Sequence, residues 1–363
     1  MKQAIFSISR ILGVDRLFAY LNRNRPVVLV FHGVTAEKPG HFCNHEGLHL
    51  YRPIFERLME LIANRYHPVS LSSIVDWLEG RAVLPSRAVA VTFDDGYRNV
   101  LTEAAPILAR FGIPATLFVA TDFVFRREQL WPDRLTSALY LTKEKQLSLE
   151  TNGGAENLPL RDDREKMAAE QKLRSLLKNV PDDERRAMLE RIVASLAVDE
   201  GETTRAWPDH APITPEELPR LFDYGVDVGS HTCTHAIVSR MRETQMEFEL
   251  AESRRLIERA TGRSCTLFSY PNGSPADFNV CARAAVIKAG YRAAVTTIKS
   301  EVAAMQDRFE IPRCTLTHNH ITLSEFAAEV SGFARLLRRA KARVTVGPAL
   351  PRSGSWQLDG DWV

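Results

Sequence analysis

The stretch AVAVTFDDGYRN at residues 88–99 is the most informative part of this sequence for both fold and function. It opens with a run of apolar and β-forming residues, the composition of a strand that is buried on both faces of a parallel sheet. Two carboxylates, Asp94 and Asp95, follow directly. Adjacent acids at the end of a buried strand repel each other unless a cation or a shared proton compensates. This strand end is therefore a candidate functional site.

Similar strand-like runs recur along the chain, and they alternate with segments of helical periodicity. The expected strands lie at residues 27–31, 115–120, 226–230, 265–270 and 293–297. The expected helices lie at residues 51–66, 99–112, 243–262 and 279–291. Repeated alternation of strand and helix predicts parallel strands joined by helical crossovers. We expect an α/β barrel or a doubly wound sheet.

One long segment breaks this alternation, from about residue 123 to residue 212. It contains no convincing strand and two charged helical segments, at 160–180 and 182–198. We interpret it as a helical insertion that forms a lid or a partner surface over the site, with simple decoration of the scaffold as the alternative.

Composition and charge limit the classes of partner and location. The chain has 363 residues, with 47 basic and 45 acidic side chains that nearly cancel, so nucleic acid is not expected as a partner. Its five cysteines form no CxxC pair, which favours reduced thiols. In the amphipathic segment 1–26, charged residues interrupt the apolar run before a signal-peptide core forms. We expect a soluble, cytoplasmic protein.

The C-terminal tail, residues 334–363, is basic in its first part. Residues 335–343 carry five arginines and lysines, and the tail has no acid before Asp359. A basic amphipathic helix formed by these residues could contact the anionic inner membrane on its cytosolic face. The alternative is a solvated surface helix.

Metal ligands are suggested by VDVGSHTCTHA, residues 226–236, where another apolar strand runs into His231 and His235. Two imidazoles and one carboxylate leave a coordination position open on a zinc-like ion, as catalytic sites require. A lone HxxxH is a weak signal, but together with Asp94 and Asp95 at a second strand end it indicates a metal-dependent enzyme.

These motifs carry a family resemblance. TFDDGY and SHTCTH resemble the first two motifs of the polysaccharide deacetylase family, the carbohydrate esterases with NodB homology. Similar stretches are LVFHGV at 29–34, LFSYPNG at 267–273, GYRAAVTT at 290–297 and IPRCTLT at 311–317. The resemblance covers residues 27–122 and 213–333. It implies a distorted (β/α) barrel domain over residues 27–333 that carries the insertion.

The resemblance also implies roles for individual residues. Asp94 corresponds to the general base, while Asp95, His231 and His235 correspond to the metal ligands, usually for Zn²⁺. The backbone N–H of Tyr97 is expected to bind the oxyanion. In many members an Arg of the third motif orients the base, but this chain has Ser269 there. What orients Asp94 is therefore left open.

Other expected site residues are less firmly placed. The general acid is expected to be His318 or His320, and His32 resembles a histidine near the metal in exopolysaccharide deacetylases. Exposed positions are expected for the loop histidines His41, His45 and His49, with a second metal site as the alternative. Tyr270, Pro271 and Asn272 are expected to line the groove. Trp131 is expected either to cover a sugar ring or to lie in the core.

The implied function is metal-dependent removal of an N-acetyl group from an amino sugar in a surface polysaccharide or lipopolysaccharide precursor. With no secretion signal expected, a nucleotide-linked or lipid-linked glycan is the expected partner. The alternatives are a deformylase, an O-acetyl esterase, cyclic amide opening, and a non-catalytic glycan-binding or scaffold protein.

Overall fold

The structure, a computed structural model, describes residues 2–40, 42–151, 154–316 and 321–345. Its main sheet has eight strands, in the order β11-β10-β9-β6-β5-β1-β12 with β4 beside β5, and every pairing is parallel. The strands are β1 Val27–Phe31, β4 His67–Pro68, β5 Ala88–Phe93, β6 Ala115–Val119, β9 Val226–Ser230, β10 Leu267–Ser269, β11 Ala293–Val295 and β12 Cys314–Thr315. All six expected strands are present.

One short segment closes this sheet into a distorted barrel. Ile311 forms a parallel bridge with Val295 of β11, at one end of the strand order. Three residues later Cys314 pairs with Leu29 of β1, at the other end. Residues 311–315 therefore contact both edges, and the expectation of a distorted (β/α) barrel is confirmed.

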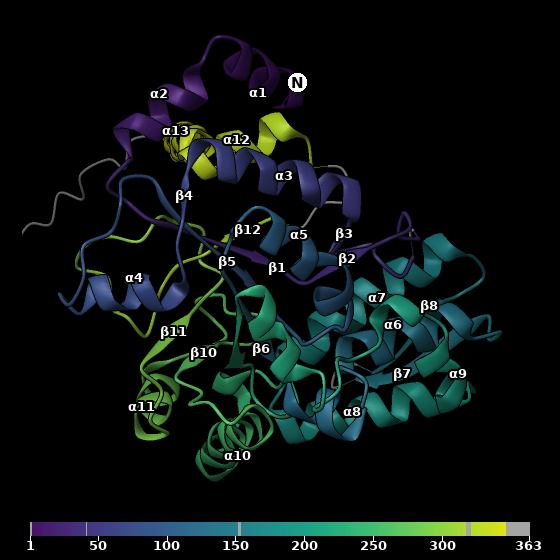
Figure 1. Cartoon of the computed structure of the whole chain (residues 1–363). Helices are drawn as coiled ribbons and strands as arrows, with labels where there is room; N and C mark the ends of the chain where they lie inside the picture. The colour runs from purple at the N-terminus through teal and green to yellow at the C-terminus, as the bar shows by residue number, and fades with distance from the viewer. Residues whose placement is uncertain (1, 41, 152–153, 317–320, 346–363) are drawn as a thin grey trace, which may run out of the picture.

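Helices cover the outside of the barrel and bury their apolar sides against it (Figure 1). The expected helix at 99–112 consists of a π-helical turn, Val100–Ala104, followed by α5. The covering helices are α3 Arg52–Arg65, α4 Leu71–Leu78, α5 Ala105–Arg110, α10 Glu243–Thr261, α11 Val280–Lys288 and α12 Leu323–Ser331. Every strand of five or more residues in the sheet except β9 is buried along its whole length, as its apolar sequence predicts.

The insertion forms a separate lobe beside the barrel with a small apolar core of its own (Figure 1). Its helices are α6 Trp131–Leu141, α7 Asp163–Lys178, α8 Asp182–Ser195 and α9 Glu200–Arg205. The expectation that it lacks strands is wrong, because β7 Gln146–Thr151 and β8 Gly154–Pro159 form an antiparallel hairpin. Among the strand residues whose burial is described, Leu147 and Leu158 join the buried core. The hairpin therefore lacks the long apolar runs used to find strands.

Four helices at the chain ends pack together on one side of the barrel, next to α3 (Figure 1). They are α1 Lys2–Ile11, α2 Val14–Leu21, α12 and α13 Phe333–Thr345. Among the described residues, no helix has both the length and the apolar character that crossing a membrane requires.

The parallel arrangement brings the ends of distant strands to one edge of the barrel. Asp94 and Asp95 follow β5, His231 follows β9, and His32 follows β1. A small two-stranded sheet, β2 Gly33–Thr35 with β3 His49–Tyr51, lies next to β1 in the chain. The candidate site is therefore assembled from segments that lie almost 200 residues apart in the sequence.

Candidate metal centre and its pocket

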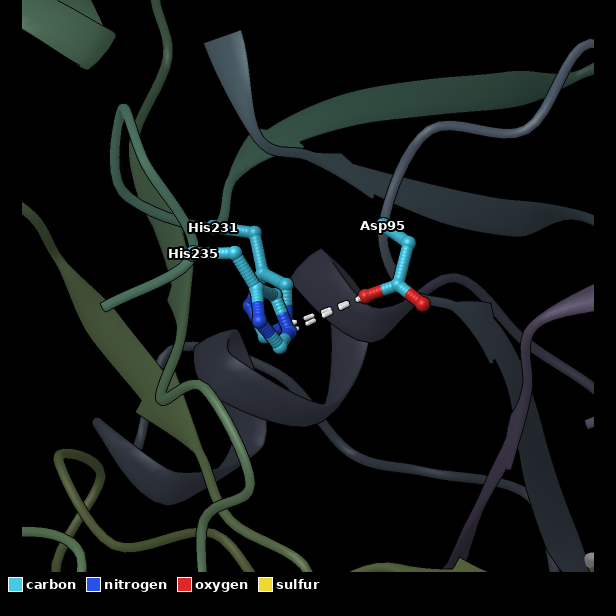
Figure 2. A group of neighbouring side chains, drawn as sticks. All are labelled: Asp95, His231 and His235. Atoms are coloured by element: carbon cyan, nitrogen blue, oxygen red, sulfur yellow. Dashed lines mark ion pairs between the residues drawn. The ribbon is translucent and has the colours of Figure 1, made fainter. Parts of the chain in front are cut away.

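Asp95, His231 and His235 form the candidate metal centre. Their ligand atoms all lie within 4.8 Å of one another, and all three residues are buried. The Oδ1 atom of Asp95 is 3.2 Å from Nε2 of His235 and 3.6 Å from Nε2 of His231. Figure 2 shows both imidazoles turned towards the Asp95 carboxylate. The sequence-predicted ligands are thus brought together.

The protonation and hydrogen bonding of this group suit a divalent cation. Nδ1 of His231 donates to the carbonyl of Ser269 at 2.7 Å, which leaves the Nε2 lone pair facing the centre. Burial lowers the pKa of His231 to about 4, so the imidazole is neutral at physiological pH. Oδ1 of Asp95 is buried without a hydrogen-bond partner among the described residues. Three buried electron-pair donors that face one another fit Zn²⁺ or a similar ion.

The backbone around the centre is strained. Asp95, Thr232, His235 and Asn272 all have positive φ, at 79°, 67°, 54° and 59°. Non-glycine residues seldom adopt this conformation, and such residues cluster at functional sites.

Two groups outside the motifs hold the turn that carries the histidines. Glu249 of α10 accepts hydrogen bonds from the backbone N–H of Cys233 at 2.7 Å and of Thr234 at 3.0 Å. The indole Nε1 of Trp131 donates to the carbonyl of His235 at 3.2 Å. The barrel and the insertion therefore both position the His231–His235 turn.

Arg313 orients the candidate base Asp94. Its guanidinium donates to both carboxylate oxygens of Asp94, at 2.8 and 2.6 Å, and to the hydroxyl of Ser269 at 2.9 Å. Burial alone disfavours the charged form of Asp94, but Arg313 outweighs it and holds the pKa of this carboxyl well below its usual range. Arg313 lies in IPRCTLT, one of the stretches that carry the family resemblance, and the resemblance implies no role for it.

A pocket of about 590 Å³ opens above the centre. Of the predicted site residues, it is lined by His32, Asp94, Asp95, Tyr97, His231, His235 and Asn272. The insertion supplies Asp133, Arg174 and Lys178, so it forms part of the pocket wall. The roles of the individual residues stay predictions.

Several predicted residues are placed elsewhere. Trp131 is only 4% exposed and packs in the core of the insertion, so it does not cover a sugar ring. Tyr270 is also buried, because its ring stacks on Phe278 with the centroids 4.7 Å apart, and neither it nor Pro271 lines the pocket. His318 and His320 lie outside the described residues.

The loop histidines are not exposed as expected. His49 is 1% exposed, because it belongs to β3 and stacks on His210 with the ring centroids 4.3 Å apart. His45 is half-buried beside Glu170 of the insertion, with Nε2 and Oε2 separated by 3.0 Å. His41 lies outside the described residues. Both described histidines thus serve packing between the barrel and the insertion.

An unpredicted hydrogen-bond network adjoins the pocket. The phenol of Tyr97 donates to Oδ2 of Asp133 at 2.8 Å, and Nδ1 of His210 lies 3.3 Å from the same oxygen. Although burial opposes ionisation of Asp133, these neighbours lower its pKa to about 2. The network links Tyr97, which follows the DDG turn, to Asp133 of the insertion.

The chain is similar to known deacetylases both in sequence and in fold. The family model described as polysaccharide deacetylase matches residues 81–140 and 190–294. A 60-residue stretch, 16% of the chain, is 43% identical to the poly-β-1,6-N-acetyl-D-glucosamine N-deacetylase of Escherichia coli K12, but it covers only 9% of that protein. Similar solved structures include the Streptococcus pyogenes deacetylase PplD (TM-score 0.56, 13% identity, covering 84% of this chain and 98% of PplD). Another is IcaB from Ammonifex degensii (TM-score 0.53, 17% identity, 85% and 97%).

Proposed function

The chain belongs to the polysaccharide deacetylase family, and from this premise we propose that it is a metal-dependent hydrolase that removes the N-acetyl group of an amino sugar. The observation that carries the proposal is the convergence of Asp95, His231 and His235, within 4.8 Å of one another, beside Asp94 in a pocket. We propose Zn²⁺ as the metal and these three residues as its ligands.

Different residues of the chain have different proposed roles in the reaction. A divalent cation, when bound, supplies a Lewis acid for the amide carbonyl. Asp94 takes the proton of the attacking water, because Arg313 keeps its carboxylate ionised and fixed in orientation. The backbone N–H of Tyr97 has no acceptor among the described residues and is proposed to stabilise the developing oxyanion. The donor of a proton to the leaving amine is proposed to be His318 or His320.

We further propose that the glycan carries a phosphate group, as a nucleotide-linked or lipid-linked precursor does. Lys178 of α7 and Lys299, which follows β11, both line the pocket, and neither has an ion-pair or hydrogen-bond partner among the described residues. Arg174 on the same wall is already paired with Glu46 at 2.9 Å and with Glu170. Two uncompensated ammonium groups favour an anionic substrate. The five free cysteines are consistent with action in the cytosol.

Release of acetate from candidate sugars tests the proposal. The zinc-loaded protein is incubated with N-acetylated and N-formylated amino sugars, each free, nucleotide-linked or undecaprenyl-linked, and mass spectrometry records which acyl group is lost. We expect acetate release and a loss of at least about a hundredfold in turnover for Asp94→Asn with metal retained. Asp223→Asn, at an exposed position away from the pocket, is the matched control. Release of formate alone, or no difference between the two variants, would refute the assignment.

A further inference from the structure

Helices α1 and α2 are attached to the barrel by their inner sides. Phe6 is buried with Ala328 and Ala334, and Phe18 lies with its ring centroid 5.2 Å from that of Phe333. Asp15 accepts a hydrogen bond from Arg65 of α3 at 2.9 Å. These contacts bury the inner face of both helices against the barrel.

The outer face of the same helices is also apolar. Of the fourteen large hydrophobic side chains that are exposed among the described residues, seven lie between Ile5 and Leu21. Ile11 is 83% exposed and Leu12 72%. We call this set the outer apolar face: Ile5, Ile8, Ile11, Leu12, Leu17, Tyr20 and Leu21. A helix that is apolar on both sides is expected to be covered on both, and exposed apolar patches mark interaction sites.

The segment that carries this face is basic. Residues 1–26 contain five basic side chains and a single acid, Asp15, which is buried and paired with Arg65. The guanidinium of Arg23 lies 4.3 Å from the centroid of the Tyr20 ring, at the edge of the face. Helix α13 contacts α2 and adds the exposed Arg339 (Figure 1). Exposed apolar side chains on a basic segment complement a surface of anionic lipid.

We propose that the outer apolar face docks on a membrane that contains anionic lipid, with α1 and α2 lying in the plane of the interface. The charges distinguish this occupant from a second copy of the chain. A symmetric dimer through this face would bring two basic segments together without acids to neutralise them. The proposal does not depend on the reaction that the pocket catalyses.

Vesicle co-sedimentation of the full chain tests this surface. The probes are neutral phosphatidylcholine vesicles and vesicles that also contain phosphatidylglycerol. We expect binding to the anionic vesicles that is at least about tenfold tighter and that weakens with added salt. The triple variant Leu12→Gln, Leu17→Gln, Leu21→Gln should lose at least about tenfold in this binding while its melting temperature is unchanged.

The controls replace equally exposed apolar side chains elsewhere. Val83 and Met305 are 94% and 95% exposed, and both lie outside residues 1–26. Val83→Gln and Met305→Gln should bind vesicles like the parent chain. Equal binding of the triple variant and the parent, or no binding of the parent to either vesicle, overturns the proposal. A stable dimer that light scattering detects in the parent and not in the triple variant would overturn it too, because the face would then join two copies.

Discussion

Arg313 and Asp94 form a bidentate ion pair that is fully buried beneath the pocket. The two nitrogens Nη1 and Nη2 lie 2.8 and 2.6 Å from Oδ1 and Oδ2. Arg313 comes from the segment that closes the barrel and is separated from Asp94 by 219 positions. Ser269, where many members of the family place the orienting arginine, only bridges the pair through its hydroxyl. The guanidinium of Arg313, which directly precedes β12, thus holds the Asp94 carboxylate in a fixed orientation.

Replacement of Arg313 by Lys should reduce turnover by at least about tenfold while zinc content stays at one per chain. Lysine keeps the positive charge but cannot hold both carboxylate oxygens, so Asp94 loses its fixed orientation. Turnover and metal content are measured on the same sample. Arg259→Lys, at an exposed position, is the control. If Arg313→Lys keeps normal turnover, the pair serves stability alone.

Metal removal should abolish acetate release and lower the melting temperature, because the proposed zinc site is formed only in the folded chain. His231→Gln should show the same low activity and should gain no thermal stability from added zinc. His67→Gln is the matched control, because His67 is exposed and does not line the pocket. A thermal shift with zinc that is equal in His231→Gln and in the parent chain would rule out the proposed ligand set.

The strands and the metal centre could be predicted because their signals are local. A buried parallel strand is an apolar run, and the acids and histidines follow such runs directly, as at Asp94 and His231. The alternation of strands and helices leaves a barrel and a doubly wound sheet open, and the family resemblance selects the barrel. Asp94, Asp95, His231 and His235 are all found at one pocket as a result.

The residues that support the site could not be predicted in this way. Arg313 contacts Asp94, which lies 219 positions away in the sequence. Glu249 of α10 contacts the backbone of Cys233, which lies 16 positions away on another element. Trp131 follows a charged stretch, where an exposed aromatic platform and a core residue look alike in sequence. The hairpin β7–β8 was missed because its strands bury few apolar side chains. Packing between residues that are distant in the sequence determines where these side chains and this hairpin lie.

Trp131→Phe tests whether the insertion stabilises the metal centre. The variant keeps most of the apolar volume but leaves the buried carbonyl of His235 without its donor, at a cost of about 1–3 kcal/mol. Because His235 already has a strained backbone, with φ of 54°, we expect weaker zinc binding as well as lower stability. Zinc titration of the apoprotein measures the effect. Trp77→Phe, a half-buried tryptophan of α4, is the control, and equal zinc affinity in both variants would contradict the prediction.

Lys178 and Lys299 should determine the preference for phosphate-bearing substrates. The double variant Lys178→Gln, Lys299→Gln should raise KM for a nucleotide-linked N-acetyl sugar by roughly tenfold and leave KM for the free sugar unchanged, with kcat unaffected in both cases. Lys172→Gln on the same helix is the control, since Lys172 pairs with Glu156 and does not line the pocket. A proportional loss on both substrates would mean that the lysines bind no phosphate.

His45 should make the contact between the barrel and the insertion dependent on pH. Burial lowers its pKa, but the hydrogen bond and charge of Glu170 outweigh this and raise the pKa above its ordinary value, with Arg174 opposing and Glu46 adding to the effect. Both ring nitrogens face acceptors, the carbonyl of Phe42 at 3.1 Å and Glu170 at 3.0 Å, so only the imidazolium can satisfy both.

A group whose folded pKa is raised contributes stability that is fully present below the unfolded pKa and is lost as the pH rises through the folded value. The free energy of unfolding of the parent chain should therefore exceed that of His45→Gln by on the order of 1 kcal/mol near pH 5.5, and the gap should shrink steadily towards alkaline pH. Urea unfolding of both chains at a series of pH values measures the gap. A gap that grows with pH would show that neutral His45, and not the imidazolium, is the form that the folded chain prefers.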